Sequence, residues 1–427
     1  MDSYTSEIEL SKLQTLYQEE LEILYLFLNK HQNIWSQEVL NHFPKSMESY
    51  DKKWLVDLDK LTEEQEWRLD CGSLDQDLSS LSLYPLLKGI KKLESIPKWI
   101  KAPLKKYPSW AFFKVGEKKE HEIKAIISTF DSLDVELNKL KLLDIGGGQG
   151  HLSRILCHYH GASSYSLDAN DEFQELGKKR LNKYPTPEGA GQVSFIHHRF
   201  GAEDLKSRDK EFELFNEVDY SIGLHTCGPL ANSHIKRLSK GKGLLNFGCC
   251  YQLLSPGSAL YQSAFVAKQL PLKYTKHALT LATRGHSLIT LEDYRIKKQV
   301  KFYRGALHFL IQSIRGEKEF LTVGSSHPRE YFKPFASYAL LKEPNLMTNK
   351  SDSELNDYYN SHHTQSQLKE IYKANLIRWR FGRLLEKFII LDRALSLVES
   401  GHKALVYEFF DQRLSPRNLG ILVKKGT

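Results

Sequence analysis

The first part of the chain carries apolar residues at helical spacing. Between Leu13 and Phe27 they recur every three or four positions, and a second apolar face of this kind begins at Trp54. Four prolines then break the pattern into short pieces: Pro85, Pro97, Pro103 and Pro108. The pattern predicts a helical region over residues 1–110.

From residue 111 to residue 255, short apolar runs alternate with longer segments of helical periodicity. The runs predict five strands, and helices such as 151–160 and 172–184 separate them. The predicted strands are 141–145, 163–168, 193–197, 218–224 and 243–247. Repeated strand–helix units of this length are typical of a parallel sheet with helices on both faces.

After residue 255 the alternation stops. The segment 256–395 has mainly helical periodicity, and Gln365–Ser400 is its clearest helix. Two apolar runs follow, 403–410 and 419–424, and because two strands joined without a helix must be antiparallel, residues 396–427 predict a hairpin. We therefore expect an α/β, Rossmann-like, seven-stranded sheet with a C-terminal antiparallel hairpin, an N-terminal helical region, and a helical insertion between strands five and six.

Composition excludes some classes of protein. The hydrophobic content of 41% and the charged content of 26% are ordinary for a globular protein. Five cysteines without a C-x-x-C pair argue against a disulfide framework and a zinc ribbon, and they favour a reducing compartment. No apolar run approaches a membrane span, and the acidic start lacks the features of a signal or transit peptide. We expect a soluble protein of the cytoplasm or nucleus.

Charge is distributed unevenly along the chain. The net charge is +8; residues 255–395 contain 22 Lys and Arg against 12 Asp and Glu, whereas residues 1–116 contain 15 against 18. A basic segment can be the electrostatic footprint of a polyanion such as RNA, and a solvated basic helical face explains the same charge equally well. In the basic and aromatic stretch from Arg378 to Arg383, we expect a helix with its aromatic residues packed inward and its arginines outside.

The first predicted strand runs into the sequence Asp-Ile-Gly-Gly-Gly-Gln-Gly, from Asp144 to Gly150. Glycines between a strand and a helix let the backbone approach a nucleotide, and the start of the helix offers free N–H groups. The dinucleotide fingerprint does not fit, because its third small position falls on the bulky His151. The pattern instead resembles motif I of class I methyltransferases, which bind S-adenosyl-L-methionine. This resemblance makes Asp144, Gly146, Gly148 and Gly150 candidate cofactor-binding residues.

Two acidic residues extend this candidate cofactor site. Asp168 ends the second predicted strand, where a carboxylate can accept hydrogen bonds from both ribose hydroxyls. The resemblance to class I enzymes implies that Glu203, which follows the third strand, lies near the adenine. Either residue can instead cap a helix. We favour the ligand role for both.

A second group of residues follows strands four and five. These strands lead into Gly-Leu-His-Thr-Cys-Gly-Pro and Gly-Cys-Cys-Tyr sequences. The carboxyl ends of parallel strands meet at one edge of the sheet, where open α/β proteins bind ligands. Our candidate catalytic residues are therefore His225, Cys227, Cys249, Cys250 and Tyr251. We predict no metal site, because the spacing is not that of a zinc motif and consecutive cysteines in an extended strand point apart.

Together these motifs resemble the methyltransferase-like protein 25 family, which includes ribosomal RNA adenine dimethylase domain-containing protein 1. The resemblance extends to the C-terminal segment 410–418 and to Lys118–Glu122 ahead of the first strand. It implies a class I methyltransferase, and it makes His121 a cofactor-binding candidate and Glu122 a further site candidate. One departure is Pro229, where the resemblance leads us to expect an aspartate after Cys-Gly.

The sequence thus predicts an S-adenosyl-L-methionine-dependent methyltransferase that acts on RNA or an RNA-associated protein, with no membrane and no DNA as partner. A protein methyltransferase, whose insertion docks a polypeptide, is the alternative among enzymes. A non-catalytic cofactor-binding scaffold is a further alternative, because Pro229 replaces a candidate base. The Asn/Asp-Pro-Pro-aromatic signature of amino-group nucleobase methylation is absent after strand four, so the sequence does not name the methyl acceptor.

Overall fold

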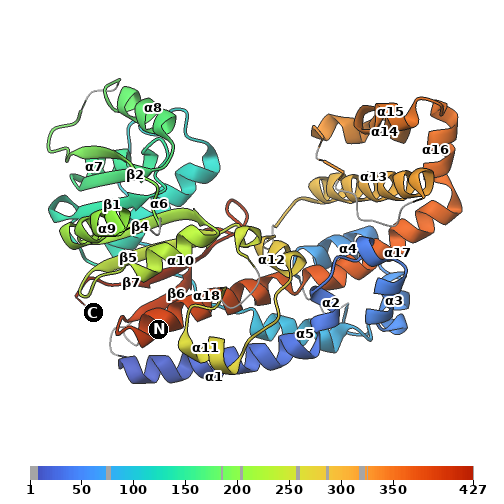
Figure 1. Ribbon diagram of the computed structural model, residues 1–427, viewed down its shortest axis with the longest axis horizontal. Helices are drawn as coiled ribbons and strands as arrows, with labels where there is room; N and C mark the ends of the chain where they lie inside the picture. Colours follow the sequence, from blue (N-terminus) through green and yellow to red (C-terminus); the bar gives the residue numbers. More distant parts are fainter. Residues whose placement is uncertain are drawn as a thin grey trace. The chain divides into compact units, whose positions relative to one another are not determined.

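The computed structural model describes residues 8–73, 78–183, 186–201, 205–255, 260–284, 288–316, 323–324 and 326–426. The chain groups into two compact units, each assembled from segments that are far apart in the sequence (Figure 1). The first unit contains residues 1–30, 94–287 and 382–427, and the second contains residues 31–93 and 288–381.

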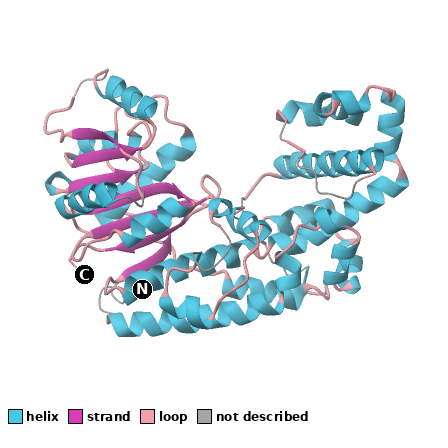
Figure 2. Cartoon of the chain, viewed as in Figure 1, coloured by secondary structure: helices cyan, strands magenta, loops and turns pink. Residues whose placement is uncertain are grey.

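The first unit is built on a seven-stranded sheet (Figure 2). The strands lie in the order β3-β2-β1-β4-β5-β7-β6; β1 to β5 are parallel, and β7 is antiparallel to both of its neighbours. Their bounds are β1 (Lys141–Ile145), β2 (Ser163–Asp168), β3 (Val193–His197), β4 (Tyr220–Cys227), β5 (Gly243–Cys249), β6 (Ala404–Glu408) and β7 (Leu419–Val423). The prediction of a Rossmann-like sheet completed by a C-terminal antiparallel hairpin is confirmed.

Helices cover both faces of this sheet. Strand β1 shows why, because alternate residues of a strand point to opposite faces. Leu142 packs in one core cluster with Phe130, whereas Leu143 and Ile145 pack in another cluster with Phe215. The helices of the first unit are α1 (Leu10–Lys30), α6 (Glu117–Ser132), α7 (His151–His160), α8 (Asp171–Leu181), α9 (Leu205–Glu217), α10 (Pro229–Lys236), α11 (Ala264–Gln269), α12 (Lys276–Thr283) and α18 (Gly382–Glu399). No helix in the described ranges is both long and apolar enough to cross a membrane.

The single helix predicted over Gln365–Ser400 is wrong. The chain forms two helices there, α17 (His362–Trp379) and α18, and the boundary between the two units falls at the break. Glycine is required where α18 begins, since a Cβ on Gly382 would lie 2.8 Å from the carbonyl oxygen of Leu281. A close backbone contact of this kind leaves no trace in hydrophobic periodicity.

The grouping of the chain cuts across both of the predicted helical regions. Helix α1 from the N-terminal region and helices α11, α12 and α18 from the insertion belong to the unit that contains the sheet. Helix α18 packs against α1, α12 and β6. Tyr17 of α1 also donates a hydrogen bond to the carbonyl oxygen of Ala404 in β6 at 2.9 Å. These helices belong with the sheet because their packing partners lie there.

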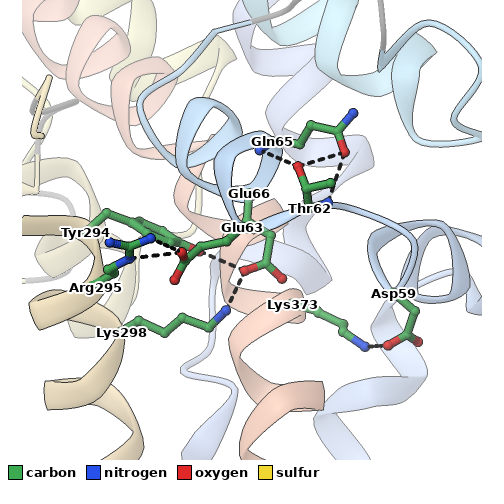
Figure 3. Close-up of polar contacts among 9 residues, drawn as sticks. All are labelled: Asp59, Thr62, Glu63, Gln65, Glu66, Tyr294, Arg295, Lys298 and Lys373. Atoms are coloured by element: carbon green, nitrogen blue, oxygen red, sulfur yellow. Dashed lines mark hydrogen bonds and ion pairs between the residues drawn. The ribbon is translucent and has the colours of Figure 1, made fainter. Parts of the chain in front are cut away.

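The second unit is helical, and polar contacts join its helices (Figure 3). Its helices are α2 (Gln32–Trp35), α3 (Lys52–Leu58), α4 (Glu63–Asp70), α5 (Tyr84–Leu93), α13 (Leu291–Arg315), α14 (Phe335–Lys342), α15 (Pro344–Met347), α16 (Asp352–Asn360) and α17. Glu66 of α4 accepts a hydrogen bond from Tyr294 of α13 at 2.9 Å and pairs with Lys298. Glu63 pairs with Arg295 at 2.7 Å. Helix α4 therefore binds α13 largely through charged groups.

Acidic residues of the segment 31–93 offset part of the basic charge of the segment 288–381. Within the second unit, residues 288–381 contain 15 Lys and Arg against 10 Asp and Glu, and residues 31–93 contain 8 against 11, which leaves a net charge of +2. Lys373, for example, pairs with Asp59 (Figure 3). The surplus of basic over acidic residues in this part of the sequence therefore does not correspond to an equally large basic surface.

The arginines that we expected on the outside of the basic and aromatic stretch are buried, so that expectation is corrected. Arg378, Arg380 and Arg383 are each only 2–3% exposed. Arg383 shows the reason, since it donates to Glu386 at 2.8 Å and to Glu408 at 2.7 Å. Paired guanidinium groups at this depth stabilise the fold, and they cannot reach the phosphates of an RNA.

Candidate functional site

The glycine turn after β1 is held by Asp168 at the end of β2. Gly146, Gly148 and Gly150 have φ values of 71°, 59° and 65°, in the left-handed region that favours glycine. The N–H of Gly148 donates to Asp168 Oδ2 at 2.8 Å, and the N–H of Asn170 donates to Oδ1 at 2.8 Å. One carboxylate therefore holds both the turn and the start of the loop before α8. Each of its oxygens keeps a further lone pair that can accept from a ligand hydroxyl.

Asp144 lies at the same turn and is 3% exposed. Ser153 of α7 donates a hydrogen bond to its Oδ2 at 2.9 Å. Burial raises the pKa of Asp144 to about 6, although the charge of Lys119 and the bond from Ser153 act in the opposite direction. Carboxyl groups perturbed by burial in this way are common at functional sites.

We expect Asp144→Asn to stabilise the protein without ligand by about 2–3 kcal/mol at pH 7, since burial raises the pKa from 3.8 to about 6. Below pH 3.8 the carboxyl is protonated in both the folded and unfolded states, so it does not lower the free energy of unfolding. As the pH rises toward 6, only the unfolded state ionises fully, so the wild-type protein loses stability over this window. Urea unfolding at several pH values measures the difference. A stability difference that does not change with pH would contradict the buried-charge explanation.

Two further residues, Glu203 and His121, were predicted to bind the cofactor. Glu203 lies outside the described residues. His121 of α6 accepts a hydrogen bond from the backbone N–H of Asp411 at 2.9 Å, and its ring lies edge-on to Phe410. Burial and the charge of Lys101 lower the pKa of His121, in accord with a neutral ring that accepts from an amide. A cofactor contact of either residue stays a prediction.

Glu122 of α6 and His225 of β4 form a pair across 103 positions of sequence. Glu122 is fully buried; its Oε2 lies 2.8 Å from His225 Nε2, and its Oε1 accepts from the Ser415 hydroxyl at 2.7 Å. Burial alone would raise the pKa of Glu122, but the bonds from His225 and Ser415 and the charge of Lys118 hold it below the ordinary value. Because an ionised carboxylate only accepts hydrogen bonds, Nε2 of His225 is the donor here, and the neutral form of the ring would have its lone pair on Nδ1.

The backbone at His225 departs from a regular strand. Its φ is 65°, and the pairing of β4 with β5 shifts register between Leu224 and Thr226. Irregularities of this kind re-aim side chains next to active sites. Here the irregularity accompanies the contact with Glu122, and the His225 side chain stays 27% exposed. The imidazole is therefore both oriented and accessible.

The three cysteines after β4 and β5 converge into one group, which we name the thiol cluster: Cys227, Cys249 and Cys250. Cys227 Sγ lies 3.2 Å from Cys249 Sγ, which lies 3.6 Å from Cys250 Sγ. The expectation that consecutive cysteines point apart assumed an extended chain, but Cys250 is left-handed, with φ 52° and ψ 49°. The contact between Cys227 and Cys249 lowers the pKa of Cys227 and raises that of Cys249. Arg417 donates to Cys250 Sγ at 3.6 Å.

Tyr251 supports the end of β5 from inside the protein. It is fully buried, and its hydroxyl donates to the carbonyl oxygen of Gly248 at 3.2 Å. The guanidinium carbon of Arg393 lies 5.4 Å from the centre of its ring. Burial raises the pKa of the phenol well above its ordinary value. The side chain has no exposed surface in this conformation, and a catalytic role of Tyr251 stays a prediction.

Ser415 and Arg417 lie at the site, although neither was a candidate from the sequence. Both belong to the connection between β6 and β7, where the match to family sequence over 410–418 was the available signal. Strand β7 pairs beside β5, which brings this connection to the carboxyl edge of the sheet. Pro229 is the first residue of α10, a position where its missing N–H costs nothing.

Comparisons with known proteins agree with this geometry. Residues 118–257, from α6 to just beyond β5, match a family model described as a methyltransferase domain. The probable methyltransferase-like protein 25 of Mus musculus is 24% identical over 226 residues, and that of Homo sapiens is 25% identical over 226 residues. Each match covers 48% of this chain but only 37% and 36% of the relatives, so it spans little more than a third of their length.

A solved structure, that of YjhP from E. coli, is 13% identical and has a TM-score of 0.26. It covers 74% of this chain and 95% of its own. A likeness of this size carries no argument, and the description of the fold rests on the strand order itself.

Proposed function

We propose that this chain, whose residues 118–257 form a class I methyltransferase domain of the methyltransferase-like protein 25 type, is an S-adenosyl-L-methionine-dependent methyltransferase that acts on RNA or an RNA-associated protein. The observation that carries the proposal is the bond between Asp168 and the glycine turn at Gly148. It sets a carboxylate at the end of β2 against a backbone that has no side chains, the arrangement that an adenosyl ligand requires.

The residues present fit this cofactor. A Cβ on Gly148 would meet no protein atom within 4 Å, so the turn leaves space for a ligand. Asp168 would accept the ribose hydroxyls, and the negative charge of Asp144 favours a cationic ligand nearby. When bound, S-adenosyl-L-methionine supplies a methyl group on a positively charged sulfur, which needs no further activation.

The chain must then position the acceptor and remove its proton. In our proposal the methyl group would pass from the sulfonium to the acceptor, and Asp168 and the glycine turn would hold the donor. The acceptor's proton passes to Nδ1 of His225, and Glu122 stabilises the resulting imidazolium through the bond at Nε2. The pair of His225 and Glu122 supplies a base, although Pro229 stands where the family resemblance leads us to expect an aspartate. The pair therefore favours an enzyme over a non-catalytic scaffold.

The distribution of charge between the two units indicates which of them would attract an RNA acceptor. The second unit has a net charge of only +2, whereas the first unit contains 37 Lys and Arg against 31 Asp and Glu. We therefore propose that the first unit provides most of the electrostatic attraction to an RNA. A protein acceptor that involves no RNA is the alternative.

Two measurements test the proposal. Calorimetry with S-adenosyl-L-methionine should detect binding to the folded protein, and no detectable binding contradicts the proposal. Transfer of a tritiated methyl group to an extract of cells lacking the protein then identifies the acceptor. Label that is lost on RNase treatment supports RNA, and label that survives RNase but not protease supports the protein alternative. Cofactor binding without any transfer favours the scaffold.

A further inference from the structure

We infer that the thiol cluster binds a single soft metal cation, and that Zn²⁺ is the ion whose chemistry it fits best. In the described part of the chain, Cys227, Cys249 and Cys250 are the one group of three or more His, Cys, Asp or Glu residues placed to hold a metal ion, and their sulfur atoms all lie within 4.8 Å of one another. Thiolates are the ligands that zinc prefers in closed protein sites. The inference revises our expectation from sequence spacing that the chain has no metal site.

The sulfur positions agree with coordination of one ion. Around a tetrahedral zinc with bonds of about 2.3 Å, sulfur atoms lie about 3.8 Å apart. Two of the sulfur pairs here are separated by 3.2 and 3.6 Å, and the third lies within 4.8 Å. Cys227 and Cys249 are register partners in β4 and β5, so the sheet itself holds two of the ligands. Three protein ligands leave a fourth position for water or another ligand.

Backbone strain distinguishes a metal site from a simple disulfide pair. Four non-glycine residues in the described ranges have positive φ, and two of them, His225 and Cys250, lie at this edge of the sheet. Such a conformation costs about 1–3 kcal/mol and persists where the surroundings require it. At Cys250 it brings a third sulfur to the cluster. A disulfide between Cys227 and Cys249 leaves the third thiol without a role, whereas a metal ion uses it as a ligand.

The charges around the cluster also fit. Three thiolates and a divalent cation carry a net charge of −1, and Arg417 donates directly to Cys250. Arg393 is buried and interacts electrostatically with Cys249, yet its Nη1 and Nη2 have no hydrogen-bond partner among the described residues. The neighbouring carboxylate of Asp392 accepts its hydrogen bonds elsewhere. A buried guanidinium in this situation is stabilised by nearby negative charge, which a metal-bound thiolate cluster provides.

Binding exchanges three S–H bonds for three sulfur–metal bonds and releases the three protons to solvent. It requires neither S-adenosyl-L-methionine nor a methyl acceptor. The inference can therefore hold or fail independently of the proposed function.

The test is a titration of the reduced, full-length protein with Co²⁺, whose thiolate complexes absorb light by charge transfer from sulfur to metal. We expect the absorbance to saturate at one ion per chain and to disappear when Zn²⁺ displaces the Co²⁺. Cys249→Ser should abolish the band. Cys71→Ser, the same substitution at a cysteine of the second unit, is the matched control and should leave the titration unchanged.

A folded, reduced protein that shows no charge-transfer band would overturn the inference, and so would a band that survives in Cys249→Ser. If Cys249→Ser does not fold, Cys250→Ala removes a half-buried ligand instead and should weaken Co²⁺ binding at least tenfold. The mass of the intact protein, measured without reductant, tests the competing assignment, which is a disulfide bond within the thiol cluster. A chain lighter by two hydrogens that binds no Co²⁺ after reduction contains a redox disulfide in place of a metal site.

Discussion

Asp168→Ala is expected to lower the affinity for S-adenosyl-L-methionine by about 10²–10⁴-fold. In the proposed function the substitution removes the acceptor of two ribose hydrogen bonds, and each hydrogen bond to a charged group contributes about 1.5–3 kcal/mol. It also releases the N–H of Gly148, which loosens the glycine turn. Isothermal titration calorimetry measures the change in affinity.

Asp171→Ala is the matched control for this variant. Asp171 is an exposed acid in the first turn of α8, and its contact with His197 is 3.8 Å long, so its removal should leave cofactor affinity unchanged. Asp168→Asn keeps the shape of the side chain without its charge and should bind with intermediate affinity. If Asp168→Ala unfolds cooperatively and binds as tightly as the wild-type protein, the ribose contact lies elsewhere.

The second large effect is expected at His225. His225→Gln should reduce the rate of methyl transfer by about 10²–10⁴-fold, the usual contribution of a general base, and should retain cofactor affinity. The initial rate of tritium incorporation into extract measures the first quantity, and calorimetry measures the second. A wild-type rate would assign the base to another residue, whereas loss of cofactor binding would assign His225 a structural role.

In the proposed mechanism Glu122 acts through His225 as a positioning residue, so its test needs a readout beyond the rate. Glu122→Gln should slow transfer and move the acidic limb of the pH–rate profile to lower pH, because the imidazolium loses its carboxylate partner. Ser415→Ala removes a neighbouring hydrogen bond to Glu122 and keeps the pair, so its profile should retain the wild-type midpoint. A slower Glu122→Gln enzyme with an unshifted profile would indicate that Glu122 only stabilises the fold.

The sequence by itself determined the elements of the sheet and the place of the glycine turn. These features follow from local rules, such as apolar runs, glycine between a strand and a helix, and the requirement that two strands joined by a short turn be antiparallel. The motif from Asp144 to Gly150 and the acidic residue at Asp168 were visible because each lies within or beside one strand. Their mutual contact follows from the parallel pairing of β1 and β2.

Only the tertiary structure decided which distant residues meet. The pair of Glu122 and His225 joins an element ahead of the sheet to an irregular strand end, and the thiol cluster depends on a left-handed residue that no periodicity predicts. The charge surplus of the insertion is likewise divided, because half of it belongs to the first unit and acids of residues 31–93 offset part of the rest. Contacts of this kind depend on long-range packing and on single backbone conformations, whereas the sequence pattern reports only the average environment of neighbouring residues.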